Sequence, residues 1–486
     1  MGVQNVLMVT SEYYGLVKSG GLADMAASLS EFHKADGKNL IAVMPFYSKL
    51  IREESLVEIP SMEVYMPEGV MLSSVRKIVR GNVDIYLIEY EDYFGRDGMY
   101  NDKNLEYEDN PKRFGYFSMA TLCLCEAIGF EPDIIHCNDW QSALVPLYLS
   151  WKKQQGIQNF KSSKTLLTIH NGTFQGKYSP SFRHFLGLGI EPFINTPYEE
   201  FGHINLLKGG VILADWVNTV SPTYAEELLT PDGSHGLHQA YTGKNGCFSG
   251  ILNGIDHSVW NPKIDPFIKK NYSDLDRRGK KECVKDLLAT MGIKYEKNTL
   301  VVGMVTRLTH QKGIRHVIDM LSSIELEKIV FICLGDGDVE FTNQLNALHH
   351  THPKNIFFYH GYDETLAHKI EAGSHIFIMP SLFEPCGLNQ MYSLKYGTLP
   401  IVRSVGGLKD TVINFDYNLN GESNGFVFHE ASSEALKNTF LWAADIFWNR
   451  AGHFNRMVAR AMKANFGNEK CGGDYSQLYD KVFNLE

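Results

Sequence analysis

Short apolar runs alternate with helix-length segments of mixed polarity along most of the chain. In the first half, the runs expected to form strands are Val6–Thr10, Leu40–Met44, Val83–Ile88, Asp133–His136, Thr165–Ile169 and Trp216–Val220. In the second half they are Leu300–Val305, Lys328–Leu334, Ile356–His360, His375–Met379 and Leu399–Val402. Each run precedes a turn-forming cluster and a helical pattern, and is too apolar for a half-exposed strand. This alternation predicts βαβ units in parallel sheets whose two faces are covered by helices.

Two such series predict an α/β protein built from two doubly wound, Rossmann-like domains. A stretch rich in Gly, Asn, Asp and Pro divides them at Ser249–Pro262. We therefore expect an N-terminal domain over residues 1–250 and a C-terminal domain over residues 251–464. Open parallel sheets bind ligands at the carboxyl ends of their strands. If two such sheets face each other, the site lies in the cleft between them.

Composition narrows the range of partners and compartments. The chain has 486 residues and a net charge of −10, a balance that disfavours nucleic acid as a partner. It has no run of about 20 apolar residues to span a membrane, and its first residues lack the features of a secretory signal. The eight cysteines are scattered, with none in a CxxC pair, which favours a reducing compartment. We expect a cytoplasmic protein with no nucleic-acid or membrane partner, and the oligomeric state stays open.

A glycine pair follows the first expected strand, in the segment SEYYGLVKSGGLADM. Gly20 and Gly21 open a helix, where backbone N–H groups and the helix dipole favour an anion, and Lys18 adds a mobile positive charge. The segment matches neither GxGxxG nor the phosphate loop GxxxxGK[ST]. A glycine-rich loop with a solvated lysine is the structural alternative.

Two segments of the second half also carry candidate chemistry. Arg307 and Lys312, in GMVTRLTHQKGI, lie just past a buried strand, where they could grip a diphosphate. In MPSLFEPCGLNQMYSLKYGTLPIV, Glu384 follows a strand and precedes a helix expected to begin near Gly387 and Leu388. An acidic residue there could accept hydrogen bonds from sugar hydroxyls, while the new helix N-terminus faces a phosphate.

These segments, together with NDWQSALVPLYL, TIHNGTFQG, LKGGVILADWVNTVSPTYAEEL, GILNGIDHSVWNP and GYDETLAHKIEAG, resemble the family of bacterial glycogen synthases and plant starch synthases. The matches keep the family's order from about Val6 to Tyr479. The resemblance implies a GT-B fold with an interdomain active site, and a C-terminal segment, residues 465–486, that rejoins the first domain. It implies a retaining hexosyltransferase, ADP-glucose:1,4-α-D-glucan 4-α-D-glucosyltransferase. Such an enzyme transfers glucose from ADP-glucose to the non-reducing end of glycogen or another α-1,4-glucan and releases ADP.

By position in the family's motifs, the catalytic candidates are Glu384, His170, Arg307, Lys312 and Asp139. The cations would hold the donor diphosphate, Glu384 the glucose hydroxyls, and His170 would line the glucose subsite. The residues expected to bind the nucleotide sugar are Lys18, Gly20, Gly21, Asp24, Tyr100, Asn171, Asn253, Tyr362, Cys386, Gly387, Leu388 and Asn389. The resemblance implies no organic cofactor and no metal ion.

Two alternatives to this function stay open. The same reaction could use UDP-glucose, because one sequence does not fix the base. A catalytically inactive glucan-binding homologue is the other alternative, and the combined presence of the basic and acidic candidates argues against it. The mechanism is open as well: the resemblance implies a front-side attack, whereas double displacement would need Asp139 or Glu384 as a nucleophile. Asp336 and Asp338, in LGDGD, mimic a metal-binding DxD pair but are better explained as a structural turn.

The chain departs from the family's pattern at several positions. Ser19 and Asn389 each stand where threonine is usual, Asn389 next to the expected phosphate site. In the C-terminal stretch 465–475, Gly472 and Gly473 fall where the family has a helix that crosses back to the first domain. A glycine inside a helix costs about 1 kcal/mol relative to alanine. We therefore expect this crossover to be looser than usual, or broken.

Overall fold

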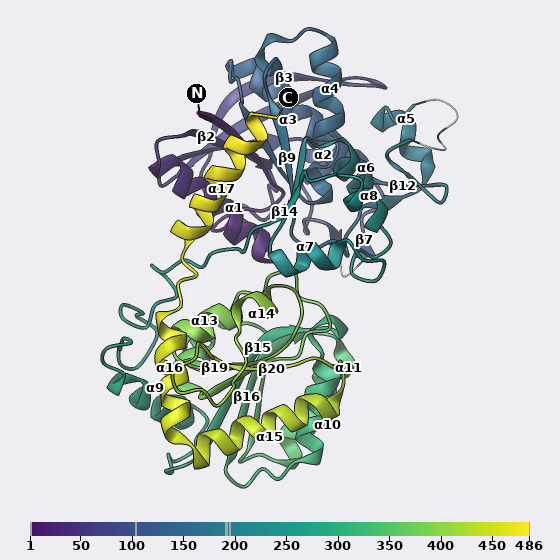
Figure 1. The fold of residues 1–486 in the computed structure, drawn as a ribbon. Coiled ribbons are helices and arrows are strands. Elements are labelled where there is room, and N and C mark those ends of the chain that lie inside the picture. Colours follow the sequence, from purple (N-terminus) through teal and green to yellow (C-terminus); the bar gives the residue numbers. More distant parts are fainter. Residues whose placement is uncertain (1, 103–104, 190–192, 194–195, 486) are drawn as a thin grey trace. The chain divides into compact units, whose positions relative to one another are not determined.

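The computed structural model describes residues 2–102, 105–189, 193 and 196–485. The chain divides into two compact units: unit 1 comprises Met1–Gly254 and Asn468–Glu486, and unit 2 comprises Ile255–Gly467. The two crossings between units fall a few residues after the positions expected from the sequence. Figure 1 shows the elements of both units. Among the described residues, no helix is both long and apolar enough to cross a lipid bilayer.

Unit 1 is built on a nine-stranded sheet with the order β14-β13-β9-β8-β1-β2-β5-β4-β3. Its strands are β1 (Asn5–Val9), β2 (Asn39–Pro45), β3 (Leu56–Met66), β4 (Gly69–Arg80), β5 (Val83–Glu89), β8 (Ile134–Asn138), β9 (Lys164–Ile169), β13 (Trp216–Thr219) and β14 (Phe248–Gly250). The six strands expected in the first half are β1, β2, β5, β8, β9 and β13, and neighbours among them pair in parallel. The predicted parallel sheet is therefore confirmed for this part of the unit.

One edge of this sheet is antiparallel, which the sequence analysis did not predict. β5 pairs with β4, and β4 pairs with β3, in antiparallel register. In this hairpin only one face is buried, as at Met62, Val64 and Met66, and the intervening residues are exposed. Strands with this alternating pattern need no helices on their outer face, so their sequences are not continuously apolar. For this reason the apolar runs of the sequence did not predict them. The remaining strands of unit 1 are β6 (Asn101–Asp102), β7 (Leu105–Glu106), β10 (Lys177–Tyr178), β11 (Glu199–Glu200) and β12 (His203–Asn205).

Unit 1 also contains the helices α1 (Gly21–Ala35), α2 (Glu91–Phe94), α3 (Asn110–Ile128), α4 (Val145–Gln154), α5 (Arg183–Leu186), α6 (Leu206–Leu213), α7 (Pro222–Leu228), α8 (His238–Thr242) and α17 (Asn468–Phe483). Several of them, such as α1, α3 and α17, pack against the sheet. The last of these, α17, comes from the far end of the chain and packs against α1, β8 and β9. Its tyrosines reach the sheet: the Tyr479 hydroxyl lies 2.8 Å from His136 Nδ1, and Asn218 donates to the Tyr475 hydroxyl at 3.0 Å.

The expectation that glycines would loosen or break the C-terminal crossover helix is wrong. α17 is one continuous helix of 16 residues that contains both Gly472 and Gly473. A Cβ atom at Gly472 would lie 2.2 Å from Cδ1 of Phe32, a residue of α1. The missing side chain thus lets α17 approach α1 closely, and the packing gained there offsets the low helix propensity of glycine.

Unit 2 has an all-parallel sheet with the order β17-β16-β15-β18-β19-β20. Its strands are β15 (Leu300–Leu308), β16 (Ile329–Gly337), β17 (Ile356–His360), β18 (Ile376–Met379), β19 (Leu399–Arg403) and β20 (Phe426–Phe428). Along β16, Phe331 and Cys333 join a buried cluster on one face, while Val330 and Ile332 join the cluster on the other. The sheet is covered on both faces, as predicted.

The helices of unit 2 are α9 (Arg278–Thr290), α10 (Ile314–Ser323), α11 (Val339–Thr351), α12 (Glu364–Gly373), α13 (Asn389–Lys395), α14 (Gly406–Thr411), α15 (Ser433–Asn449) and α16 (Ala451–Lys463). The two carboxylates of LGDGD have structural partners. Asp338 caps α11 by accepting the backbone N–H of Glu340 at 2.8 Å, and Asp336 accepts from its neighbour Gly337 and contacts His360. These contacts agree with the interpretation as a structural turn.

Candidate active site

Strand order reverses at one point in each sheet. In unit 1 the chain proceeds outward from β1 to β2 on one side and later to β8 on the other, so β1 and β8 flank the switch point. In unit 2, β15 and β18 flank it. Ligands of open α/β sheets bind beside the carboxyl ends of such strands. The residues that follow these four strands include Asp139, Lys312 and Glu384, so the topology of each unit singles out the same segments as the sequence motifs.

Asp139 follows β8 in a backbone conformation that is rare for a residue with a side chain. Its φ is 54° and its ψ is −171°. Its Oδ1 accepts the backbone N–H of His170 at 2.7 Å, which ties the end of β8 to the end of β9. Burial raises the pKa of the Asp139 carboxyl to about 7, although the hydrogen bonds that it accepts oppose the shift. Backbone strain together with a carboxyl that titrates near neutrality is typical of a functional site.

His170 is held as a neutral ring with one free acceptor. Its Nε2 lies 2.9 Å from Oδ1 of Asn138, whose amide nitrogen in turn donates to the backbone carbonyl of Val9. Nε2 therefore carries the proton, and Nδ1 presents a lone pair. Within the described residues, this buried Nδ1 has no hydrogen-bond partner. Because burial lowers the pKa of His170 to about 3, the ring suits hydrogen bonding to a hydroxyl better than proton donation.

Two asparagines of unit 1 are also among the residues expected to bind the nucleotide sugar. Asn253 is buried, and its Oδ1 also lacks a hydrogen-bond partner in the part of the chain that the structure describes. Such an orphaned buried oxygen is costly unless a ligand or water satisfies it. Asn171 uses its Oδ1 within its own loop, where it accepts the backbone N–H of Thr173 at 3.1 Å.

The glycine-rich segment begins α1 as predicted, but its backbone N–H groups are already in use. α1 starts at Gly21 with Gly20 as its N-cap. The backbone N–H groups of Ser19 and Gly20 donate to the carboxylate of Glu12, at 2.6 and 3.3 Å. In this structure a protein carboxylate therefore lies beside the N–H groups of Ser19 and Gly20, and the contact of Gly20 and Gly21 with the nucleotide sugar stays a prediction.

Lys18 and Asp24 pair with each other in the same segment. Lys18 Nζ lies 2.7 Å from both carboxylate oxygens of Asp24. The pair is partly exposed, so its two members can exchange partners at low cost. Tyr100 approaches from a separate segment, and its hydroxyl lies 2.7 Å from Ser11 Oγ and 2.8 Å from Glu12 Oε1. Ser19, Gly20 and Tyr100 thus contact Glu12, and Lys18 directly precedes Ser19 in the chain.

Glu12 belongs to the glycine-rich segment SEYYGLVKSGGLADM, but the sequence analysis did not identify it as a site residue. Its signal is its place three residues after β1, since Asp139 also lies just past a strand, one residue after β8, the neighbouring strand of the switch point. The two carboxyl groups are close enough for the negative charge of Glu12 to raise the pKa of Asp139 further.

In unit 2, Lys312 and Glu384 form a largely buried ion pair. Lys312 Nζ lies 2.6 Å from Glu384 Oε2, and the same oxygen accepts the hydroxyl of Ser381 at 2.8 Å. Lys312 follows β15 and Glu384 follows β18, so the pair spans the switch point. Arg307, near the end of β15, is exposed. A bound anion beside this pair would meet both a preorganised ammonium group and a mobile guanidinium.

The loop from Glu384 to Asn389 is fixed by its neighbours. Gly387 has a φ of 71°, which favours glycine, and the amide of Gln390 donates to the carbonyls of Cys386 and Gly387 at 3.1 and 2.9 Å. Asn389 donates to the carbonyl of Val305 at 2.6 Å, which joins the loop to β15. The loop is therefore a rigid part of unit 2, and α13 begins at Asn389, directly after Leu388.

Tyr362 is the candidate that lies apart from this group. It follows β17, the edge strand of the sheet, whereas Lys312 and Glu384 follow the central strands. It is 71 % exposed.

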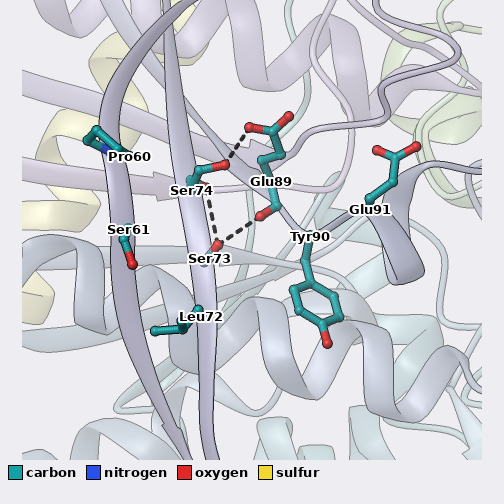
Figure 2. A pocket seen from close by; sticks show the side chains of 8 residues that line it. All are labelled: Pro60, Ser61, Leu72, Ser73, Ser74, Glu89, Tyr90 and Glu91. Carbon is teal, nitrogen blue, oxygen red and sulfur yellow. Dashed lines mark hydrogen bonds between the residues drawn. The ribbon is translucent and has the colours of Figure 1, made fainter.

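A hollow on unit 1 contains none of the candidate residues. It has a volume of about 450 Å³ and is lined by Pro60, Ser61, Leu72, Ser73, Ser74, Glu89, Tyr90 and Glu91. Figure 2 shows these residues, which come from β3, β4, the end of β5 and the start of α2 that follows it. Ser74 donates to Glu89 across two of these strands at 2.5 Å. The hollow is thus separate from the strand ends that carry the candidate chemistry.

Two known protein families match most of the chain, and known relatives match nearly all of it. The family described as starch synthase catalytic domain matches residues 5–242, and that described as glycosyl transferases group 1 matches residues 292–445. A glycogen synthase of Photobacterium profundum is 39% identical over 480 residues, which covers 98% of this chain and 94% of that protein.

The solved structures that match this chain include a starch synthase and a sucrose-phosphate synthase. The catalytic domain of starch synthase IV from Arabidopsis thaliana, bound to ADP and acarbose, matches with a TM-score of 0.90 and 30% identity over 100% of both chains. A sucrose-phosphate synthase from Thermosynechococcus elongatus matches with a TM-score of 0.61 and 17% identity over 99% of both chains, a likeness of fold alone.

Proposed function

Because the chain belongs to the family of bacterial glycogen synthases and plant starch synthases, we propose that it transfers glucose from ADP-glucose to the non-reducing end of an α-1,4-glucan with retention of configuration. Family membership also confirms the predicted GT-B class, since the structural neighbours are glycosyltransferases with two α/β domains. Glycogen or a similar glucan is the proposed acceptor, and ADP the proposed product. The choice of ADP-glucose is supported by the ADP in the related starch synthase.

The observation that carries the proposal is the buried pair of Lys312 and Glu384 beside the exposed Arg307. Breaking the bond between glucose and diphosphate leaves negative charge on the departing phosphate. Arg307 and Lys312 would stabilise that charge, and a preorganised donor of this kind is worth about 3 kcal/mol in the transition state. Glu384 would then accept hydrogen bonds from glucose hydroxyls. The ion pair therefore fixes the position of Lys312, which would bind the phosphate, relative to Glu384, which would bind the sugar.

The candidates of unit 1 fit the glucose subsite. The free lone pair of His170 Nδ1 and the orphaned Oδ1 of Asn253 are both acceptors, and sugar hydroxyls are donors. Because His170 is uncharged at neutral pH, it would orient a hydroxyl and not supply a proton. Lys18 would exchange Asp24 for the donor diphosphate, and Tyr100 would lie near the donor sugar.

These roles favour a front-side reaction over a covalent glucosyl-enzyme. A double displacement needs an ionised carboxylate that is free to attack the anomeric carbon. Glu384 is tied to Lys312, and burial keeps the Asp139 carboxyl partly protonated near neutral pH. The leaving phosphate oxygen would take the proton of the attacking glucan hydroxyl on the same face. This route needs charge stabilisation and positioning, but no metal ion or organic cofactor.

The test is an assay of glucose transfer with two donors. The purified chain is incubated with glycogen and radiolabelled ADP-glucose or UDP-glucose, and released nucleotide and labelled glucan are measured. We expect faster turnover with ADP-glucose, unchanged activity in EDTA, and label that an α-1,4-specific glucosidase removes. Preference for UDP-glucose would correct the donor, and no turnover with either donor would refute the enzyme. If Glu384→Ala kept full activity, the site assignment would be wrong.

A further inference from the structure

Glu12 is part of the segment SEYYGLVKSGGLADM and contacts both the start of α1 and Tyr100, although it was not among the expected site residues. It follows β1 at the switch point of the sheet, and only 3 % of the residue is exposed. A carboxylate buried to this degree is costly unless hydrogen bonds satisfy it. The hydrogen-bond partners of the Glu12 carboxylate therefore indicate its structural role.

One oxygen of Glu12 holds the start of α1. Its Oε2 accepts the backbone N–H groups of Ser19 and Gly20, at 2.6 and 3.3 Å. The N-terminus of a helix favours a negative charge at this position. Glu12 acts here as a built-in anion that fixes the conformation of the loop just after Lys18.

The other oxygen fixes a second segment. Glu12 Oε1 accepts the Tyr100 hydroxyl at 2.8 Å and also the hydroxyl of Ser19. Tyr100 contacts Ser11 as well, at 2.7 Å, so its ring is held from two neighbouring positions of the chain. A single side chain thus ties the loop of Lys18 to the segment of Tyr100.

The four hydrogen bonds also limit what Glu12 does. An ionised carboxylate offers about four lone-pair sites. Two backbone N–H groups and two hydroxyls fill them, which leaves no free acceptor for a sugar or for an attacking hydroxyl. Its role is therefore indirect.

We propose that Glu12 is a positioning residue of the donor site, whose carboxylate holds Lys18 and Tyr100 in the arrangement that receives the nucleotide sugar. The inference rests on the proposed function, because it concerns how the same site recognises its donor. It predicts a specific effect on the donor and none on the glucan acceptor.

Two substitutions separate positioning from charge. Glu12→Ala removes all four hydrogen bonds. Glu12→Gln can keep them, because its carbonyl accepts both backbone N–H groups and its amide donates to hydroxyls that can also accept. We expect Glu12→Ala to raise the KM for the donor about tenfold or more while the KM for glycogen stays within about twofold, and Glu12→Gln to stay within about threefold of the wild type for both.

The matched control is Glu89, a carboxylate at the end of β5 in the same sheet. It accepts from Ser74 and pairs with Arg76 at 2.9 Å, so Glu89→Ala also removes a hydrogen-bonded strand-end carboxylate. We expect its donor KM to match the wild type. The proposal is overturned if Glu12→Ala has a normal donor KM, if Glu12→Gln is as impaired as Glu12→Ala, or if the KM values for donor and acceptor rise together.

A second pair of variants covers the case in which Glu12→Ala does not fold. Ser19→Ala removes one hydroxyl contact to Glu12, and Ser19→Thr keeps it. We expect Ser19→Ala to raise the donor KM about threefold to tenfold and Ser19→Thr to stay near the wild type. Equal donor KM values for both variants and the wild type would overturn the proposal. Failure of the proposed function is distinguishable, because the wild type itself would then be inactive with both donors.

Discussion

Two adjacent glycines in α17 give a direct test of the packing between the two ends of unit 1. A Cβ atom at Gly472 would lie 2.2, 2.3 and 2.6 Å from three ring atoms of Phe32 in α1, far inside van der Waals contact. A Cβ atom at Gly473 would meet no atom of the described residues within 4 Å. The substitutions Gly472→Ala and Gly473→Ala therefore make the same chemical change in the same helix with opposite surroundings.

The size of the effect follows from two opposing terms. Replacing glycine by alanine inside a helix stabilises it by up to about 1 kcal/mol. At Gly473 nothing opposes this gain. At Gly472 the new methyl group forces Phe32 or the helix to move, and overpacking of this kind costs about 1–3 kcal/mol. We expect Gly473→Ala to be more stable than the wild type, Gly472→Ala less stable, and the two to differ by about 2 kcal/mol.

Hydrogen exchange of the α17 amides is the suitable assay, because it measures local opening of a helix without requiring a two-state transition of both units. Since 1.4 kcal/mol is a factor of ten, exchange over residues 468–483 should be more than tenfold faster in Gly472→Ala than in Gly473→Ala. Exchange in α10 of unit 2 serves as the internal control and should not change. Equal slowing of exchange in both variants would refute the close contact between α17 and Phe32.

Three further substitutions test the candidate site. Lys312→Ala should lower kcat/KM for the donor about 10²-fold or more, because it removes a preorganised cation and leaves the buried Glu384 without its partner. The control Lys285→Ala removes a lysine from an exposed ion pair and should have no effect. Equal activities of the two variants would contradict the role of Lys312. Asp139 has a folded-state pKa raised to about 7, so its contribution to stability is complete below pH 4 and lost as the pH rises through 7. Denaturant unfolding from pH 4.5 to 7.5 should therefore show the advantage of the wild type over Asp139→Asn falling by about 3 kcal/mol, and parallel curves would exclude the shift. Gly406 has a φ of 41°, and a Cβ atom there would lie 1.9 Å from the carbonyl oxygen of Glu384. Gly406→Ala should therefore displace the loop that carries Glu384 and reduce kcat at least tenfold. Steady-state kinetics measures this effect, and an unchanged kcat would disprove it.

Much of the fold was predictable because parallel strands carry a strong signal. Runs such as those in β1 and β16 are buried on both faces, so their composition alone marks them. The hairpin of β3 and β4 carries a weaker signal, since only alternate residues are buried and Pro60 interrupts the pattern. Antiparallel edges of this kind require a search for period-two alternation.

Site residues that belong to local sequence motifs could be predicted, but the contacts between them could not. Lys312 and Glu384 were identified separately, but their ion pair depends on β15 and β18 being neighbours, which no local pattern encodes. Glu12 was missed for the same reason: its four hydrogen-bond donors come partly from Tyr100, which is 88 positions away in the chain. The contact of Gly472 with Phe32 joins residues still farther apart, so propensity alone gave the wrong expectation for α17.

The origin of α17 has a consequence for how the protein forms during synthesis. Unit 2 occupies a continuous stretch of the chain, whereas the sheet of unit 1 waits for α17, which the ribosome makes afterwards. Until Tyr475 and Tyr479 arrive, Asn218 and His136 lack these partners, and the apolar surface that α17 covers on β8 and β9 is open to other nascent chains. The first unit to begin is thus the last to be completed, and a released chain that lacked residues 468–486 would carry a complete unit 2 attached to an unfinished unit 1, which is a substrate for chaperones.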